Sequence, residues 1–404
     1  MIRSLHLQGD LPEPDSRPRF AIAAKGFRPF FLVAASFACC IVPFWLLVVA
    51  GLVRPTSYLD ATTWHAHEMV LGFGVAVIAG FLLTAVGNWT QRETLVGPWL
   101  LVLAGVWALG RVAMLFAGAL PRGVAACIDL AFLPALLVVL ARPLVATGNR
   151  RNFVMLAILG VLLAANVVVH LSALGAMSAG SARMACLVAI DVVLLVILVI
   201  SGRTFPMFTR NATGATAIQS VAALDVMTIA AMALLVVLDA MVPTGRVASY
   251  FAGVVGVLAL ARAARWGTRL TAKHPLVWIL HAGYGWCVAG LLLRALTGFI
   301  PAIPSSVATH ALTVGAIGSL TLGMMARVAL GHTGRPLVVA RPVVWAFVAI
   351  TAAAVVRVVA PLLAPSWYLA SLIAAGSLWS LAFALYLTVY APILVAPRLD
   401  GKVG

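Results

Sequence analysis

Histidines near the ends of long apolar segments are the residues of this chain best suited to chemistry. His65 and His67 begin one such segment, within Trp64-His-Ala-His-Glu68, and His310 begins another on the same side of the predicted bundle. Neutral imidazole is a common axial ligand of haem iron and a good ligand for copper. Imidazoles on two helices at one depth could therefore hold a porphyrin from opposite faces. His65 and His67 point to different flanks at 100° per residue, so one suits a ligand role and the other a hydrogen bond, without deciding which.

Two further histidines are candidate metal ligands. His281 lies seven residues beyond His274, about 10.5 Å along a helix, which is too far for both to chelate one metal ion. We therefore expect His281, the deeper of the two, to serve a separate centre or a proton path. His170 ends the fifth apolar segment on the side of His65, where a ligand role and a hydrogen-bonding role are equally open.

Arginines inside apolar segments form a second group of candidates, because ionisable groups within a bilayer are costly and commonly functional. They are Arg111, Arg294 and Arg357. Guanidinium groups match carboxylates, including the two propionates of a haem. Aspartates in the same region offer a competing explanation by ion pairing between helices. They are Asp129, Asp191 and Asp239.

The elements that must position these residues are membrane helices. Of the 404 residues, 63% are hydrophobic and only 9% are charged, too few polar residues to cover a water-soluble globule. The apolar runs approach the ~20 residues that span a bilayer, and they lack the alternation of barrel strands. We predict an all-α polytopic membrane protein with about twelve transmembrane helices in one bundle. The predicted spans are 30–53, 65–87, 98–117, 122–141, 152–171, 184–202, 221–242, 247–263, 275–298, 306–330, 342–363 and 367–390.

The segments outside these spans are short. Residues 1–27 are expected to form a cytoplasmic tail, since they are polar and unlike a signal peptide, and residues 393–404 a second one. Residues 28–392 then form one transmembrane domain. The longest internal loop is expected at about 202–220, where Gly, Pro, hydroxyl and aromatic residues predict a segment packed against the helix ends.

The net charge of +16 is explained by topology rather than by nucleic-acid binding, which we do not expect. Lys and Arg follow the positive-inside rule, with 19 on the cytoplasmic side against 4 outside when the N-terminus is inside. Anionic lipid headgroups are the ordinary partners of such residues. The four on the outside are Arg54, Arg122, Arg183 and Arg246.

Several strings of the sequence resemble the NnrS family, in order and over almost the whole chain. They are Lys25-Gly-Phe-Arg-Pro-Phe30, Trp64-His-Ala-His-Glu68, Gly202-Arg-Thr-Phe-Pro-Met-Phe-Thr-Arg-Asn211, His310 to Gly318 and Arg327 to Arg335. The resemblance implies a bacterial inner-membrane protein of about twelve helices with haem b and also copper. It further implies a role in nitric oxide metabolism and nitrosative-stress defence during denitrification.

A weaker resemblance is to the large subunit of haem-copper oxidases and nitric oxide reductases, which also carry haem-ligating histidines on helices 2 and 10. Here the tenth span has one histidine in place of a His-x-His pair, and the sixth and seventh spans have none. The usual copper or iron partner site of that superfamily is therefore absent as such.

The leading hypothesis is a haem-binding protein of nitric oxide defence, with His65 or His67 and His310 as ligands and His281 at a second centre. An open iron position would let it bind or reduce nitric oxide, whereas a bis-histidine site would carry electrons from a donor. The sequence assigns no catalytic residue and leaves enzymatic activity open. The alternatives are a secondary transporter of a metal or metal-nitrosyl species, against which the lack of visible repeats counts, and a non-catalytic membrane partner or sensor in denitrification.

The charge distribution makes a topological prediction. Green fluorescent protein fused after Gly404 should fluoresce, and alkaline phosphatase fused at Gly118, between the third and fourth spans, should be active, because each folds only on its own side of the membrane. Swapping the two reporters is the control and should abolish both signals. Active phosphatase at Gly404 would contradict the assigned orientation.

Overall fold

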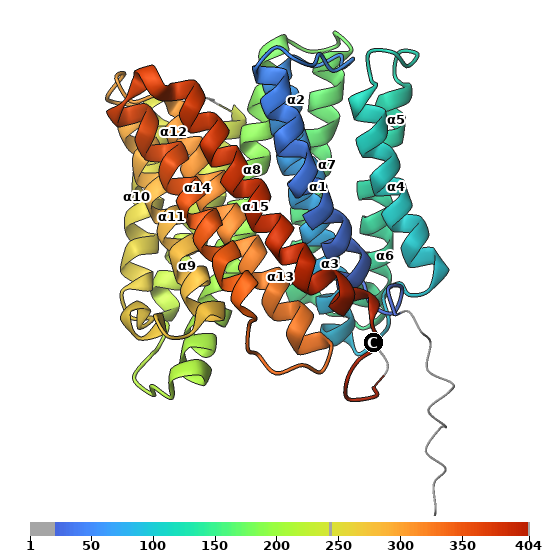
Figure 1. The fold of residues 1–404 in the computed structure, drawn as a ribbon, viewed down its shortest axis with the longest axis vertical. Helices are drawn as coiled ribbons and strands as arrows, with labels where there is room; N and C mark the ends of the chain where they lie inside the picture. Colours follow the sequence, from blue (N-terminus) through green and yellow to red (C-terminus); the bar gives the residue numbers. More distant parts are fainter. Residues whose placement is uncertain (1–20, 242–244, 403–404) are drawn as a thin grey trace, which may run out of the picture.

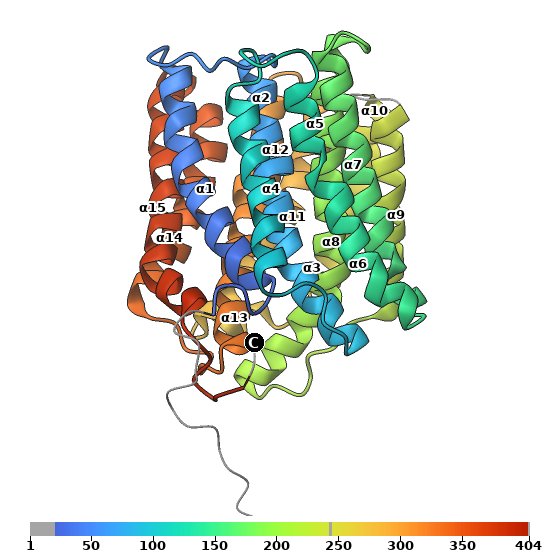
Figure 2. The ribbon, with the colours of Figure 1, turned by 90° about the vertical axis from the view of Figure 1, so that its right-hand side faces the viewer.

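The computed structural model describes residues 21–241 and 245–402, which form a bundle of helices running side by side (Figure 1, Figure 2). Twelve helical stretches are long and apolar enough to cross a membrane, and the described residues contain no strand. The prediction of an all-α, multi-pass membrane protein is confirmed. Most of the predicted N-terminal tail, residues 1–20, lies outside the described residues.

The helices and short helical turns follow one another in chain order. They are α1 (Phe27–Val49), α2 (Ala61–His67), η2 (Glu68–Gly74), α3 (Val75–Thr90), α4 (Pro98–Leu115), α5 (Val124–Leu130), α6 (Phe132–Ala146), η3 (Arg150–Asn152), α7 (Phe153–Ala173), α8 (Ala179–Thr213), α9 (Ala222–Met241), α10 (Arg246–Ala263), η4 (Thr268–Thr271), α11 (Pro275–Thr297), α12 (Ser305–His310), η5 (Ala311–Gly318), α13 (Ser319–His332), α14 (Arg341–Leu363), η6 (Pro365–Trp367) and α15 (Tyr368–Val395).

The two described ends of the chain meet at one end of the bundle, the lower end in Figure 1. The backbone N–H of Ala21 donates to the carbonyl of Val395 at 2.7 Å, and Arg28 donates to the carbonyls of Leu394 and Ala396 at 2.8 and 2.7 Å. We call this the terminal end and the opposite one the distal end. An even number of spans places both ends of the chain on the same side of the bundle. The first and last helices, α1 and α15, pack against each other there.

Small residues let the first helix pack closely against its neighbours. Ala34, Ala35 and Ala38 of α1 are completely buried, and α1 packs against both α15 and α3. Helices in lipid usually associate through close approach of their backbones, because the hydrophobic effect does not drive apolar helices together in an apolar solvent. This packing joins the two ends of the chain into one bundle.

Two of the twelve spans contain a π-helical segment. In the second span η2 directly follows His67, and in the tenth span η5 directly follows His310. A π turn loosens the regular hydrogen-bond pattern and is frequent at functional sites. At η2 the indole N–H of Trp107 donates to the carbonyl of Gly72 at 3.1 Å, which supplies a partner from α4.

The predicted loop at 202–220 is wrong over residues 202–213, because α8 continues to Thr213. Phe205 is buried between the rings of Trp266 and Tyr284, and Thr209 is buried beside His281. These contacts outweigh the helix-breaking tendency of Pro206. The helix ends where Gly214 adopts a left-handed φ of 71°.

Gly202 of α8 lies directly beside the side chain of Arg262 of α10. The Arg262 guanidinium of α10 donates to the carbonyl of Leu198 at 2.8 Å and pairs with Asp225 of α9. A Cβ atom on Gly202 would overlap that guanidinium group. A glycine is therefore required for Arg262 to join three helices.

This contact generates a stability prediction. Gly202→Ala should lower the free energy of unfolding by about 1–3 kcal/mol, because the added methyl group displaces Arg262. Gly160→Ala on α7, where a Cβ meets no atom within 4 Å, is the control and should be neutral or slightly stabilising. Thermal unfolding in detergent measures both, and equal stability of the two variants would contradict this account.

Candidate functional site

A cavity of about 760 Å³ lies inside the distal half of the bundle. Its walls come from helices far apart in the sequence, including α1, α2, α8, η5, α14 and α15, and its lining is mainly apolar. The volume falls within the ~300–1,000 Å³ common for small-molecule sites. Its arginine, aspartate and histidine lining residues are His65, Arg183, Asp191, Asp239, Arg294, His310 and Arg357.

His310, the last residue of α12, presents a lone pair in this cavity. Its Nδ1 lies 2.7 Å from the carbonyl oxygen of Ser306. A carbonyl can only accept, so Nδ1 carries the proton and Nε2 of the neutral ring keeps its lone pair. This tautomer is the one that a metal-ligating histidine needs.

His65 lines the same cavity from α2. Its ring is stacked on the indole of Trp45, with ring centroids 4.5 Å apart and an angle of 14° between the planes. The Nδ1 atom of His65 is buried and has no hydrogen-bond partner in the part of the chain that the structure describes. The structure thus brings His65 and His310 together, with the orientation of His65 set by Trp45.

Arg357 supplies a buried positive charge beside the two imidazoles. Its Nε and Nη1 atoms have no hydrogen-bond partner among residues 21–241 and 245–402. The guanidinium lies 5.6 Å from the ring of Tyr368 and reaches the phenol oxygen only at 3.4 Å. Because a buried guanidinium is costly without an acceptor, the cavity is suited to an anionic ligand group.

Arg294 also faces the cavity, but it is paired. Its Nη1 lies 2.9 and 3.1 Å from the two carboxylate oxygens of Asp191, and its Nη2 pairs with Asp239. Of the two explanations open for Arg294, the geometry therefore favours ion pairing between helices over propionate binding.

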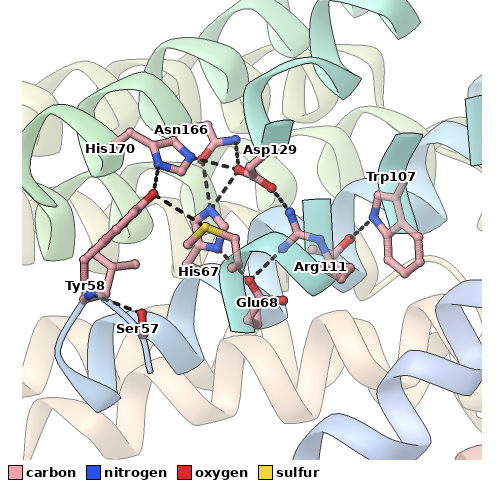
Figure 3. Close-up of polar contacts among 12 residues, drawn as sticks. Ser57, Tyr58, His67, Glu68, Trp107, Arg111, Asp129, Asn166 and His170 are labelled. Atoms are coloured by element: carbon pink, nitrogen blue, oxygen red, sulfur yellow. Dashed lines mark hydrogen bonds and ion pairs between the residues drawn. The ribbon is translucent and has the colours of Figure 1, made fainter. Parts of the chain in front are cut away.

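His67 faces away from the cavity, on the other flank of its helix, as the helical spacing predicted. It is buried, with Nδ1 2.9 Å from Glu68 Oε1 and Nε2 3.0 Å from Asn166 Oδ1 (Figure 3). The structure therefore separates His67 from His65 and His310.

Arg111 holds the cluster around His67 together. It pairs with Glu68 of η2, at 2.8 Å, and with Asp129 of α5 (Figure 3). The space beside Gly72 is filled by this side chain, since a Cβ there would lie 2.9 Å from Arg111 Nη1. The guanidinium needs this space to reach both carboxylates.

His170 joins the same cluster and His281 lies elsewhere. His170 Nε2 is 2.9 Å from Asp129 Oδ2 and its Nδ1 is 2.6 Å from the Tyr58 hydroxyl. His281 has a threonine hydroxyl 2.9 Å from each ring nitrogen, Thr209 on one side and Thr268 on the other. His281 neither lines the cavity nor belongs to the cluster around His67.

Several residues of these sites were not among the candidates from sequence. Asn166 could have been noticed, because an amide inside the apolar span of α7 requires a buried partner. Trp45 and Tyr58 carry no such signal, since aromatic residues are ordinary near the ends of membrane spans. Their roles depend on which imidazole each one meets.

The ion pairs of Arg111 generate a prediction. Arg111→Met should destabilise the protein by about 3–5 kcal/mol, because two buried carboxylates lose their partner. Arg54→Met, which alters an exposed residue of the loop before α2, should stay within about 0.5 kcal/mol of the parent. Unfolding by denaturant in detergent provides the measurement, and indistinguishable effects would show that the pairs contribute no stability.

Comparison with known protein families confirms the resemblance seen in the sequence. The family model described as NnrS protein matches residues 21–398, nearly the whole chain. No curated protein matches the chain.

Proposed function

Because the chain belongs to the NnrS family, a family of membrane proteins associated with nitric oxide, we propose that it binds haem b in the distal cavity and acts there on nitric oxide. The observation that carries this proposal is the meeting of His65, His310 and Arg357, which has two nitrogens without partners among the described residues, around one cavity. Haem would supply an iron that takes imidazole ligands and binds nitric oxide.

The residues present fit such a group on three counts. The cavity combines aromatic walls from Trp45, Phe73 and Trp379 with imidazoles, which suits a flat, largely apolar macrocycle. His310 already has the tautomer that leaves Nε2 free for a metal. Arg357 offers two buried donors, Nε and Nη1, that a propionate could accept from.

His65 determines which chemistry is open to the site. As a second axial ligand it would complete a bis-histidine centre that takes electrons from an external donor. As a neighbour of an open position it would leave room for nitric oxide to bind or to be reduced. Copper, which the resemblance implies, has no assigned ligands in this cavity and stays a prediction.

The orientation of the cavity follows from the basic residues. We place the protein in a bacterial inner membrane with its terminal end in the cytoplasm, since that end carries Lys25, Arg92, Arg203 and Arg335. The distal cavity would then lie in the periplasmic half, and anionic lipids would contact the cytoplasmic rim.

A secondary transporter of a metal or metal-nitrosyl species is the second candidate. Its supporting observation is that the π segments η2 and η5 change the regular hydrogen bonding of two spans that bound the cavity, although neither helix is broken as the discontinuous helices of transporter sites are. A protein that holds haem without turning over nitric oxide would instead suit a sensor or partner role.

Absorption spectra test the haem proposal. Protein purified from haem-sufficient cells should show a Soret band that changes on reduction and again on adding nitric oxide. His310→Ala should lose the band or change its axial-ligand signature, whereas His281→Ala, which alters a histidine outside the cavity, should not. The absence of a Soret band from the unaltered protein would overturn the proposal and favour uptake assays in proteoliposomes.

Arg357→Leu separates anion recognition from iron ligation. It should weaken haem binding about 10–100-fold, as for a lost charged hydrogen bond worth ~1.5–3 kcal/mol, while the axial-ligand spectrum of the bound fraction stays the same. Unchanged affinity would show that Arg357 does not hold a carboxylate of the ligand.

A further inference from the structure

The second span carries histidines on two flanks, and the flank away from the cavity has a site of its own. One ligand atom from each of His67, Asp129 and His170 lies within 4.8 Å of the other two, and all three residues are buried. We propose that they bind a first-row divalent transition-metal ion, in a site separate from the distal cavity and independent of haem.

His67 is held in the form that a ligand requires. Its Nδ1 lies 2.9 Å from Glu68 Oε1, and Glu68 is paired with Arg111 at 2.8 Å. The paired carboxylate accepts from Nδ1–H, so Nε2 of the neutral ring has a lone pair. Metal-ligating histidines characteristically donate their other ring N–H to a carboxylate in this way.

His170 can adopt the same form through Tyr58. The Tyr58 hydroxyl lies 2.6 Å from His170 Nδ1 and 3.7 Å from the Met114 sulfur, to which it can donate. Its oxygen can then accept from Nδ1–H and leave the Nε2 lone pair of His170 facing Asp129.

Asp129 turns one carboxylate oxygen toward Arg111 and the other toward the two imidazoles. Its Oδ1 pairs with Arg111, and its Oδ2 lies 2.9 Å from His170 Nε2 and 3.3 Å from His67 Nε2 (Figure 3). Asn166 donates to the same Oδ2 at 2.8 Å, which fixes the carboxylate. One oxygen is thus neutralised by the guanidinium while the other converges with two imidazoles.

The spacing and the charge both suit a cation. Zinc-type bonds of ~2.0–2.1 Å in a tetrahedral shell separate ligand atoms by about 3.3 Å, close to the distances from Asp129 Oδ2 to the imidazoles. With neutral imidazoles the cluster has two carboxylates, Glu68 and Asp129, against one guanidinium, Arg111. A bound cation offsets the excess negative charge, which is costly to bury.

Protons on the imidazoles are the competing way to satisfy these atoms. Asn166 Oδ1 and Asp129 Oδ2 both face His67 Nε2, and without a metal that nitrogen needs a proton to interact favourably with them. Imidazole and carboxylate ligands suit Cu²⁺ and Zn²⁺, which stand at or near the top of the order of affinity for such sites. A metal therefore competes with protons for the same lone pairs.

Metal analysis tests the site in full-length, detergent-solubilised protein. Chelator-treated protein is loaded with Cu²⁺ or Zn²⁺, freed of excess metal by gel filtration and measured by mass spectrometry. The unaltered protein should retain about one equivalent more than His67→Gln/His170→Gln. His281→Gln, the matched buried histidine bonded at both nitrogens, should retain metal as the parent does.

Two further readouts distinguish a metal site from a hydrogen-bond network. The electron paramagnetic resonance spectrum of the Cu²⁺ form should show coupling to two imidazole nitrogens. Tyr58→Phe, a milder change should the double variant fail to fold, should weaken metal binding about 10–100-fold as expected for a partner of a ligand. Equal metal in the parent and Tyr58→Phe proteins, or Cu²⁺ without nitrogen coupling, would overturn the proposal and leave adventitious metal or protons.

Haem content provides the link to the first proposal. Because His170 does not line the cavity, His170→Gln should bind haem as the parent does while losing the metal. Loss of metal with retained haem supports two separate sites. A parent protein that lacks haem but holds the metal would overturn only the haem proposal.

Discussion

The cost of an unpaired charge in a bilayer is the constraint on which the rest of this structure depends. Arg111 meets it by pairing with Glu68 and Asp129, and in doing so joins α4, η2 and α5. Arg294 meets it with Asp191 and Asp239, which joins α11 to α8 and α9. These pairs act as fixed points between helices whose apolar faces would otherwise pack with little specificity. Against this background Arg357, a buried cavity-facing arginine with no carboxylate in ion-pair distance in the described chain, marks a place where a ligand would complete the structure.

The second span shows how one helix can serve two sites. His65 and His67 are two residues apart and lie on opposite flanks, one beside the cavity and the other inside a buried polar network. The π segment that begins at Glu68 directs that carboxylate toward Arg111. The two flanks differ in chemical character: the cavity has unpartnered donors, whereas the network has converging acceptors. Our proposals of haem on one side and of a metal cation on the other rest on that difference.

The paired residues also bear on how a cofactor could act. Asp191, Asp239 and Arg294 form an ion-paired wall of the cavity, whereas Arg357 is a buried guanidinium of the same cavity with no carboxylate in ion-pair distance among the described residues. A ligand with an anionic group and an apolar body would thus have a defined orientation. His310, held by its carbonyl contact to Ser306, keeps its position independently of what His65 does. One imidazole is fixed by the backbone, and the other is oriented by a stacked indole.

The sequence by itself determined the twelve helices. In lipid each span must satisfy its own backbone hydrogen bonds as a helix, and the spans can be recognised in the sequence as long apolar runs. The sequence also singled out most of the buried ionisable residues, because they interrupt such runs, but not Arg28, which is buried although it precedes the first predicted span. Only the tertiary structure decided which of them meet: Arg294 and Asp191 are 103 positions apart, and His67 and Asn166 are 99 apart. It likewise decided that α8 continues through Pro206 to Thr213, because Phe205 and Thr209 pack against residues distant in the chain. The local pattern of apolar residues is enough to predict the helices, because each helix satisfies its own backbone. Which buried charges pair depends on the residues that lie next to one another in space.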